Sequence, residues 1–144
     1  MIDKAGIERL MPHAGTMCLL ERVLHWDANS IRCVALSHRN PHNPLAVDQR
    51  LGAACGVEYA AQAMAVHGGL RRGVGESPTA GYLLSIRGLT LHTVFLDDLG
   101  DELVVEAERL AGEQSQVSYR FSLTYAGTPV LEGRAVVLLD VAPI

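Results

Sequence analysis

Aromatic residues are scarce in this chain, at 5% of its 144 residues, although hydrophobic residues as a whole reach 49%. The core of a domain of this size must therefore be built mainly from Ala, Val and Leu. No run approaches the roughly 18 apolar residues that a membrane-spanning helix needs, and the first residues lack the apolar segment of a secretion signal. We expect one domain over residues 1–144, without a membrane span and located in the cytoplasm.

Clusters of basic residues and of metal ligands are also missing. The formal net charge is −4 and the positive charges are scattered, so no footprint for nucleic acid is visible. Cys18, Cys33 and Cys55 are far apart, which argues against disulfides and a structural zinc site. His38 and His42 have an HxxxH spacing, but the proline between them prevents the helix that makes this spacing useful. We expect neither a metal ion nor a cofactor.

The hydrophobic pattern predicts one long helix among several strands. The helix is expected over 49–67, with Asp48 as its N-cap and a glycine pair after its end. A loop over 37–45 with two prolines precedes it. A period of two residues elsewhere predicts strands. The expected elements are a short helix over 3–11 and strands over 17–26, 30–36, 81–94 with a kink at Gly88, 102–109, 115–125 and 130–139.

The long helix is apolar on nearly every side, which predicts that it is buried all round, as in a sheet wrapped about a central helix. Glu58 is the only ionisable acid in it. An unpaired buried carboxylate costs several kcal/mol, roughly, so it normally pairs or stays protonated. One interpretation is a general acid with a raised pKa. The other is a structural ion pair with Arg87 or Arg120.

Two segments carry a resemblance to a known family. Residues 10–23 read LMPHAGTMCLLERV, a Pro-His followed by an apolar strand that ends in Glu-Arg-Val, and residues 56–63 read GVEYAAQA. They resemble the N-terminal segment and the central helix, with its catalytic Glu, of beta-hydroxyacyl-acyl carrier protein dehydratases. His13, and His38-Arg39 before Asn43-Pro44-Leu45, look typical of the aryl-polyene-type branch. The resemblance implies an α+β hotdog fold, in which an antiparallel sheet wraps around one long central helix.

The resemblance also implies an activity, namely dehydration of a 3-hydroxyacyl thioester in fatty-acid-like or polyene biosynthesis. The acyl chain would be carried on the phosphopantetheine arm of an acyl carrier protein, or on coenzyme A. The enzyme would be a homodimer or higher oligomer, or a heteromer with a related dehydratase, with its sites between subunits. A His of one subunit would remove the alpha proton, and Glu58 of the other would protonate the beta hydroxyl. Gly56, Val57 and Gln62 are the expected substrate-binding residues.

The sequence departs from the family at the position of the catalytic base, the His that removes the alpha proton. The Gly-His-Phe-Pro motif that holds the family's catalytic His is missing, and the loop over 37–45 takes its place. We favour His38 as the base, with His42 and then His13 as alternatives. The missing motif leaves open a noncatalytic, acyl-binding partner subunit of a dehydratase heteromer. An acyl thioesterase is the other alternative, because some hotdog enzymes use a helix carboxylate to activate water.

Overall fold

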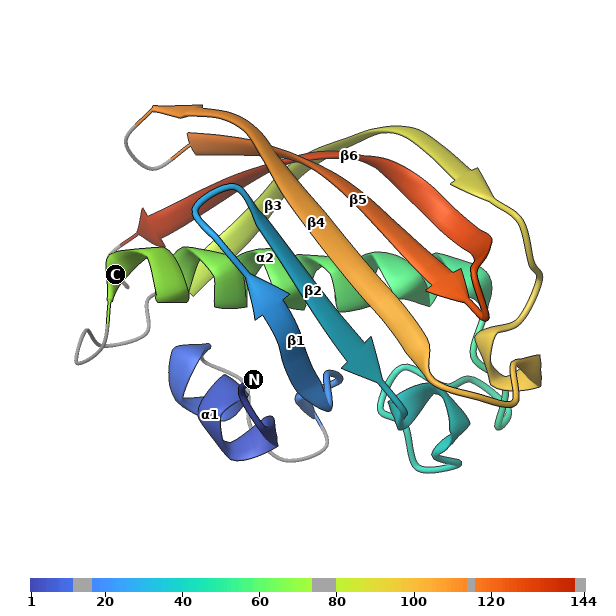
Figure 1. Ribbon diagram of the computed structural model, residues 1–144. Coiled ribbons are helices and arrows are strands. Elements are labelled where there is room, and N and C mark those ends of the chain that lie inside the picture. Colours follow the sequence, from blue (N-terminus) through green and yellow to red (C-terminus); the bar gives the residue numbers. More distant parts are fainter. Residues whose placement is uncertain (12–16, 74–79, 114–115, 142–144) are drawn as a thin grey trace.

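A six-stranded antiparallel sheet curves around one long helix in the computed structural model, which describes residues 1–11, 17–73, 80–113 and 116–141 (Figure 1). The strand order is β1-β2-β4-β5-β6-β3. This confirms the α+β hotdog fold. The elements are α1 (Lys4–Leu10), β1 (Arg22–Trp26), β2 (Ser30–Ala35), α2 (Gly56–Arg72), β3 (Ala80–Leu91), β4 (Leu103–Glu113), β5 (Gln116–Tyr125) and β6 (Thr128–Val141).

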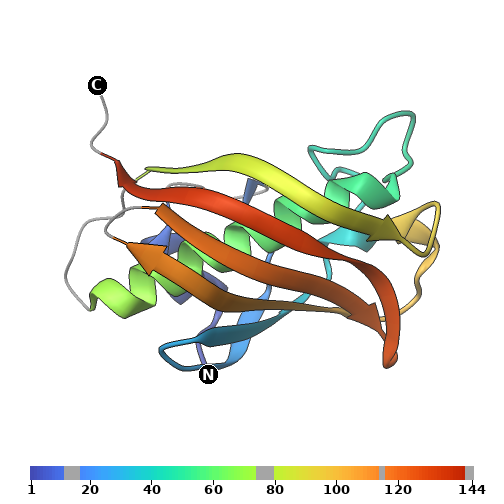
Figure 2. The same cartoon turned by 90° about the horizontal axis from the view of Figure 1, so that it is seen from above.

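The core lies between the inner face of the sheet and α2, which crosses beneath the strands (Figure 2). Strand β5 shows why one face of the sheet packs against the core. Its apolar residues alternate with polar ones, so one face is buried and the other faces solvent. The buried side chains are Val117, Tyr119, Phe121 and Leu123. Within the described residues, no helix is both long and apolar enough to cross a bilayer.

Helix α2 is shifted along the sequence from its expected position. It begins at Gly56 after a short 3-10 turn, and Asp48 and Gln49 instead adopt positive φ values of 51° and 63° in a turn. Asp48 is therefore not the N-cap. The helix also runs through the glycine pair to Arg72, and a Cβ on Gly69 would lie 2.9 Å from the carbonyl oxygen of Leu10. This glycine lets α1 pack closely on α2 and does not end the helix.

The expectation that α2 is buried all round is wrong for the single chain. At Gly56 a Cβ would collide with the side chain of Leu131, so this end of the helix is pressed against the sheet. On the side away from the sheet, Ala54 and Glu58 are exposed and Ala61 is partly exposed. One flank of the central helix is therefore open.

Strand β3 is an edge of the sheet, hydrogen-bonded to β6 along one side. The predicted kink is confirmed, since Gly88 has a φ of 60° and the register with β6 shifts between Arg87 and Thr90. Large apolar side chains are exposed along this strand, which is unusual for an edge open to water. They are Leu83, Leu84, Leu89 and Leu91.

Candidate active site

The loop over 37–45, which carries two of the candidate bases, is tied to α2 by the hydroxyl group of Tyr59. Ser37 Oγ donates to the carbonyl oxygen of Leu19 at 2.7 Å, so its single hydrogen is already used. The 2.8 Å bond between Ser37 Oγ and Tyr59 must then have Tyr59 as its donor. Asn43 Nδ2 in turn donates to the Tyr59 oxygen at 3.0 Å. Every hydrogen in this chain of bonds is therefore assigned.

Asn43 also fixes the internal shape of the loop. Its Nδ2 donates to the carbonyl oxygen of Ser37 at 2.9 Å, and its Oδ1 accepts from the Leu45 amide at 2.9 Å. Neither Asn43 nor Tyr59 was predicted from the sequence as a site residue. A signal was available, because a buried tyrosine normally finds a hydrogen-bond partner for its hydroxyl group, and Tyr59 directly follows Glu58.

His38 is buried, with 1% of its surface exposed, and points toward the segment before β4. Its Nε2 lies 3.2 Å from the carbonyl oxygen of Leu99, which can only accept, so the hydrogen is assigned to Nε2. Nδ1 has no hydrogen-bond partner among the described residues. Burial lowers the pKa of His38, opposed in part by the backbone of Asp101 and of Leu99. The ring is therefore neutral at pH 7, with Nδ1 left as its proton-accepting nitrogen.

Glu58 lies in the first turn of α2, where the helix dipole favours a negative charge. It is exposed in the single chain, so the burial on which the general-acid interpretation depends is absent there. The ion-pair interpretation is wrong, because Arg120 pairs with Glu108 at 3.5 Å and Arg87 lines the outer face of the sheet. A second subunit over the open flank of α2 is needed to bury this carboxyl group.

The three predicted substrate-binding residues differ in their surroundings. Gln62 is buried and its amide group is occupied, because Oε1 accepts from the Leu19 amide at 2.8 Å and Nε2 donates to the Met17 carbonyl oxygen at 2.6 Å. It thereby holds the segment that leads into β1. Gly56 packs against the sheet, and Val57 is partly exposed. Their roles in substrate binding stay predictions.

His42 is exposed on the loop, with its backbone amide bonded to Asn40 Oδ1 at 2.9 Å. His13 lies outside the described residues. Among the residues that are described, no three His, Cys, Asp or Glu side chains converge to hold a metal ion. The candidate site therefore consists of the loop with its two histidines and the start of α2.

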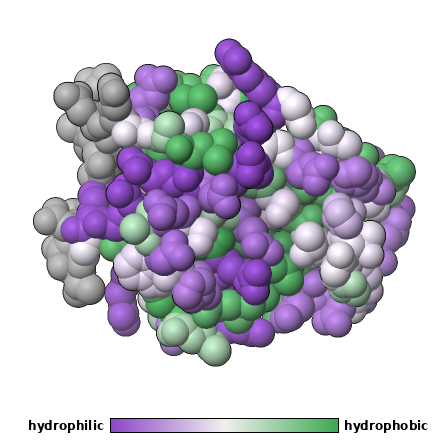
Figure 3. Space-filling view, turned by 45° about the horizontal axis from the view of Figure 1, so that its top comes forward, coloured by the Kyte–Doolittle hydropathy of each residue, from purple (hydrophilic) through white to green (hydrophobic). Residues whose placement is uncertain are grey.

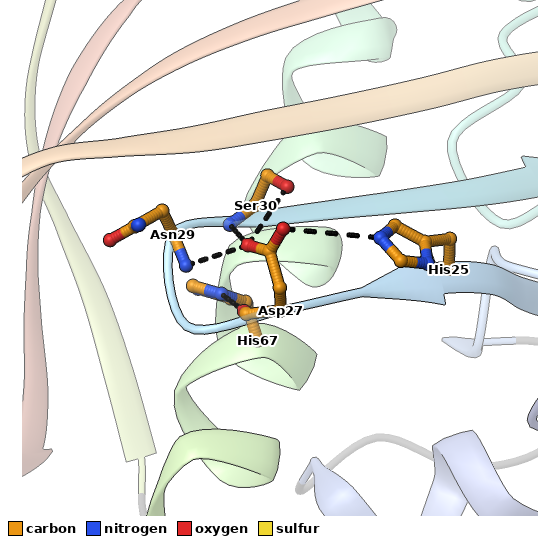
Figure 4. Close-up of polar contacts among 5 residues, drawn as sticks. All are labelled: His25, Asp27, Asn29, Ser30 and His67. Atoms are coloured by element: carbon orange, nitrogen blue, oxygen red, sulfur yellow. Dashed lines mark hydrogen bonds and ion pairs between the residues drawn. The ribbon is translucent and has the colours of Figure 1, made fainter.

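A second buried histidine, His67, lies near the other end of α2 (Figure 4). Its Nε2 is 2.8 Å from the carbonyl oxygen of Asp27, and its Nδ1 is 2.7 Å from the hydroxyl group of Tyr119. Burial lowers its pKa as well. The Asp27 side chain is used inside the β1–β2 turn, where it accepts from the amides of Asn29 and Ser30, each at 2.8 Å. His67 thus joins α2 to this turn and to β5.

A model of the ApeP-like dehydratases matches residues 5–140. The chain belongs to the ApeP-like dehydratase family. No curated protein matches its sequence significantly. The match to the family model confirms the resemblance read from residues 10–23 and 56–63, and with it a dehydratase of the aryl-polyene type.

Solved structures resemble this ApeP-like chain in fold. The dehydratase heterocomplex ApeI:P from Xenorhabdus doucetiae is 24% identical, with a TM-score of 0.81, and the match covers 94% of this chain and 91% of that one. A Helicobacter felis homologue of HP0420 is 15% identical over 100% and 95% of the two chains, with a TM-score of 0.66. A mutant thioesterase from Pseudomonas aeruginosa is 13% identical over 82% and 79%, with a TM-score of 0.55.

Proposed function

We propose that this ApeP-like dehydratase removes water from a 3-hydroxyacyl thioester in fatty-acid-like or polyene biosynthesis in the cytoplasm. The acyl chain is carried by the phosphopantetheine arm of an acyl carrier protein, or by coenzyme A. Family membership supports the reaction class. The observation that carries the proposal is the unpartnered Nδ1 of His38, on a loop that Tyr59 ties to the helix that bears Glu58.

In the proposed reaction, Nδ1 of His38 takes the alpha proton of the substrate. The electron pair of that C–H bond forms the carbon–carbon double bond as the beta carbon–oxygen bond breaks. The carboxyl group of Glu58 gives its proton to the departing hydroxyl group, which leaves as water. The backbone N–H of Val57 stabilises the charge that develops on the thioester oxygen, while that of Gly56 already donates to the carbonyl oxygens of Ala53 and Ala54. The proton on His38 then returns to the Glu58 carboxylate.

A second subunit is part of the proposed site. The open flank of α2 with Glu58 and the leucine-rich edge of β3 are the two surfaces that a subunit has to cover. The solved heterocomplex from Xenorhabdus doucetiae makes a related dehydratase a suitable partner, with a second copy of this chain as the other arrangement. In either case Glu58 acts with a loop histidine from across the interface.

The burial of His38 supports a second candidate function. A base that is 1% exposed cannot reach a substrate in the single chain. The second candidate is therefore a noncatalytic subunit that binds acyl chains beside an active dehydratase. The two candidates differ in whether His38 is needed for turnover once the complex has formed.

Mass spectrometry of a 3-hydroxyacyl-carrier-protein substrate distinguishes the proposed dehydratase from the noncatalytic subunit. The wild type, Glu58→Gln, His38→Gln and the exposed-loop control His42→Gln are each assayed alone and with a co-expressed related dehydratase. Loss of one water that disappears with Glu58→Gln and His38→Gln, but not with His42→Gln, supports the proposed mechanism. Water loss in the heteromer that none of the three variants alters selects the noncatalytic subunit. Cleavage of the thioester in place of water loss makes the chain a thioesterase.

A further inference from the structure

The outer face of the sheet, on the side opposite α2, holds a hollow of about 930 Å³. Its lining comes from all six strands, and polar side chains gather over this face (Figure 3). The volume lies in the range of small-molecule binding sites, about 300 to 1,000 Å³. This hollow takes no part in the proposed dehydration, since Glu58 and the loop over 37–45 belong to elements outside its lining.

Three arginines stand side by side across this hollow. Arg120 of β5 is the direct cross-strand partner of Arg134 in β6, and Arg134 is the direct partner of Arg87 in β3. Neighbouring strands lie about 4.8 Å apart, so the three side chains start from adjacent positions in one row. All three are exposed. The row places three guanidinium groups in the hollow of a chain whose net charge is −4.

The carboxylates on this face are placed away from two of these arginines. Glu108 lies 3.5 Å from Arg120, at one end of the row, and no ion pair to Arg87 or Arg134 is formed within the described part of the chain. Other groups of the outer face do have partners: Arg32 pairs with Glu106, and His92 Nε2 lies near Glu132 Oε1, each at 3.6 Å. Like charges directly opposite each other destabilise a sheet. The row is therefore a local exception on a face where the other charges are balanced.

We propose that the row of Arg87, Arg120 and Arg134 binds a ligand that carries two phosphate groups. Arginine guanidinium groups bind phosphate oxygens through paired N–H donors, and three of them in a row match an extended anion better than a single carboxylate. A diphosphate also has the charge needed to balance two unpaired arginines and a third that is shared with Glu108. Arg134 lies in the middle of the row and contributes most.

Calorimetric titration with inorganic pyrophosphate tests the site, with ADP as a second probe that carries an organic group. Titrations with sulfate at matched ionic strength measure nonspecific anion binding. We expect pyrophosphate to bind about tenfold more tightly than sulfate. Arg134→Gln is expected to weaken pyrophosphate binding at least tenfold. The matched control is Arg32→Gln, because Arg32 lies on the same face but is paired with a carboxylate. This substitution is expected to change the affinity for pyrophosphate less than twofold.

Two results overturn the proposal. One is equal affinity for sulfate and pyrophosphate, or equal losses in the two variants, because both indicate only a diffuse attraction of anions. The other is a lower thermal unfolding temperature for ligand-free Arg134→Gln, because that result assigns the arginine a structural role. The proposal requires this temperature to stay the same or rise, since the substitution removes two like-charge neighbours. Tighter binding of ADP than of pyrophosphate identifies a nucleotide-type ligand. Equal affinities for ADP and pyrophosphate identify a simple diphosphate as the ligand. Both support the site.

Discussion

The two buried histidines, His38 and His67, are held in the same way on one ring nitrogen and differently on the other. In each, Nε2 donates to a backbone carbonyl oxygen, of Leu99 and Asp27 respectively. The Nδ1 of His67 then accepts from the hydroxyl group of Tyr119, whereas the Nδ1 of His38 has no partner among the described residues. A histidine with both nitrogens bonded is part of the core. A histidine with one unused nitrogen in a buried loop is a candidate for chemistry.

The largest expected difference between the two histidines is in catalysis. Glutamine keeps an N–H donor but has no basic ring nitrogen, so His38→Gln is expected to lower turnover about 10²- to 10⁴-fold. The matched variant His67→Gln is expected to leave turnover of the folded protein within about twofold. Single-turnover dehydration by the complex measures both. Similar losses in the two variants would show that His38 has no special role in turnover.

Stability is expected to show the reverse order. His67→Ala leaves the Tyr119 hydroxyl and the Asp27 carbonyl groups without partners and opens a cavity, so we expect it to lower the free energy of unfolding by about 3 kcal/mol. His38→Ala also opens a cavity but breaks one hydrogen bond, to Leu99, so it is expected to cost less, about 2 kcal/mol. Urea denaturation of the two variants measures the difference, and a larger loss for His38→Ala would contradict it.

The pH dependence of stability is expected to report both rings. Each has its pKa lowered in the folded chain, so the unfolded chain binds more protons just below the usual value of 6.5. Their stabilisation is complete above pH 6.5 and is lost as the pH falls from there toward the lowered values, by at most about 1.4 kcal/mol per pH unit for each ring. Urea denaturation between pH 5 and 8 measures this loss. It is expected to shrink in His67→Gln, and an unchanged profile would contradict the assignment.

The smallest effect concerns the two buried tyrosines. Tyr59→Phe and Tyr119→Phe each remove one buried hydroxyl group, and each is expected to cost about 1 to 2 kcal/mol of stability. Only Tyr59 is bonded to the loop that carries His38, through Ser37 and Asn43. Tyr59→Phe is therefore expected to lower kcat about tenfold without a change in KM, as measured by steady-state assay, while Tyr119→Phe leaves kcat unchanged. Equal kcat values would show that the loop keeps its position without Tyr59.

Much of the fold could be predicted because hydrophobic periodicity is a local property. The alternation in β5 and the apolar run of α2 gave the sheet, the central helix and their order along the chain. The ends of α2 could not be predicted in this way. The glycines at 68 and 69 look like a helix end, but both lie inside the helix, where Gly69 leaves room for a distant segment, at Leu10, to pack closely. Such contacts between distant segments are not visible in a local pattern.

The candidate site was predictable in its residue types more than in its environment. Glu58 stood out because it is a single acid in an apolar helix, yet its exposure in the single chain depends on which flank the sheet covers. Gln62 looked like a substrate-binding residue by resemblance, whereas its amide group binds the backbone of Met17 and Leu19. The role of Tyr59 depends on Ser37 and Asn43, which lie 22 and 16 residues away in the sequence.

The leucine-rich edge of β3 has a consequence for how cells must supply this protein. An uncovered edge strand with exposed leucines can pair with any other unprotected strand, which is a route to aggregation. In the proposed heteromer, a chain made in excess over its partner is therefore expected to accumulate in insoluble form. In that arrangement the soluble yield of this chain depends on balanced synthesis of the two subunits as well as on its own stability.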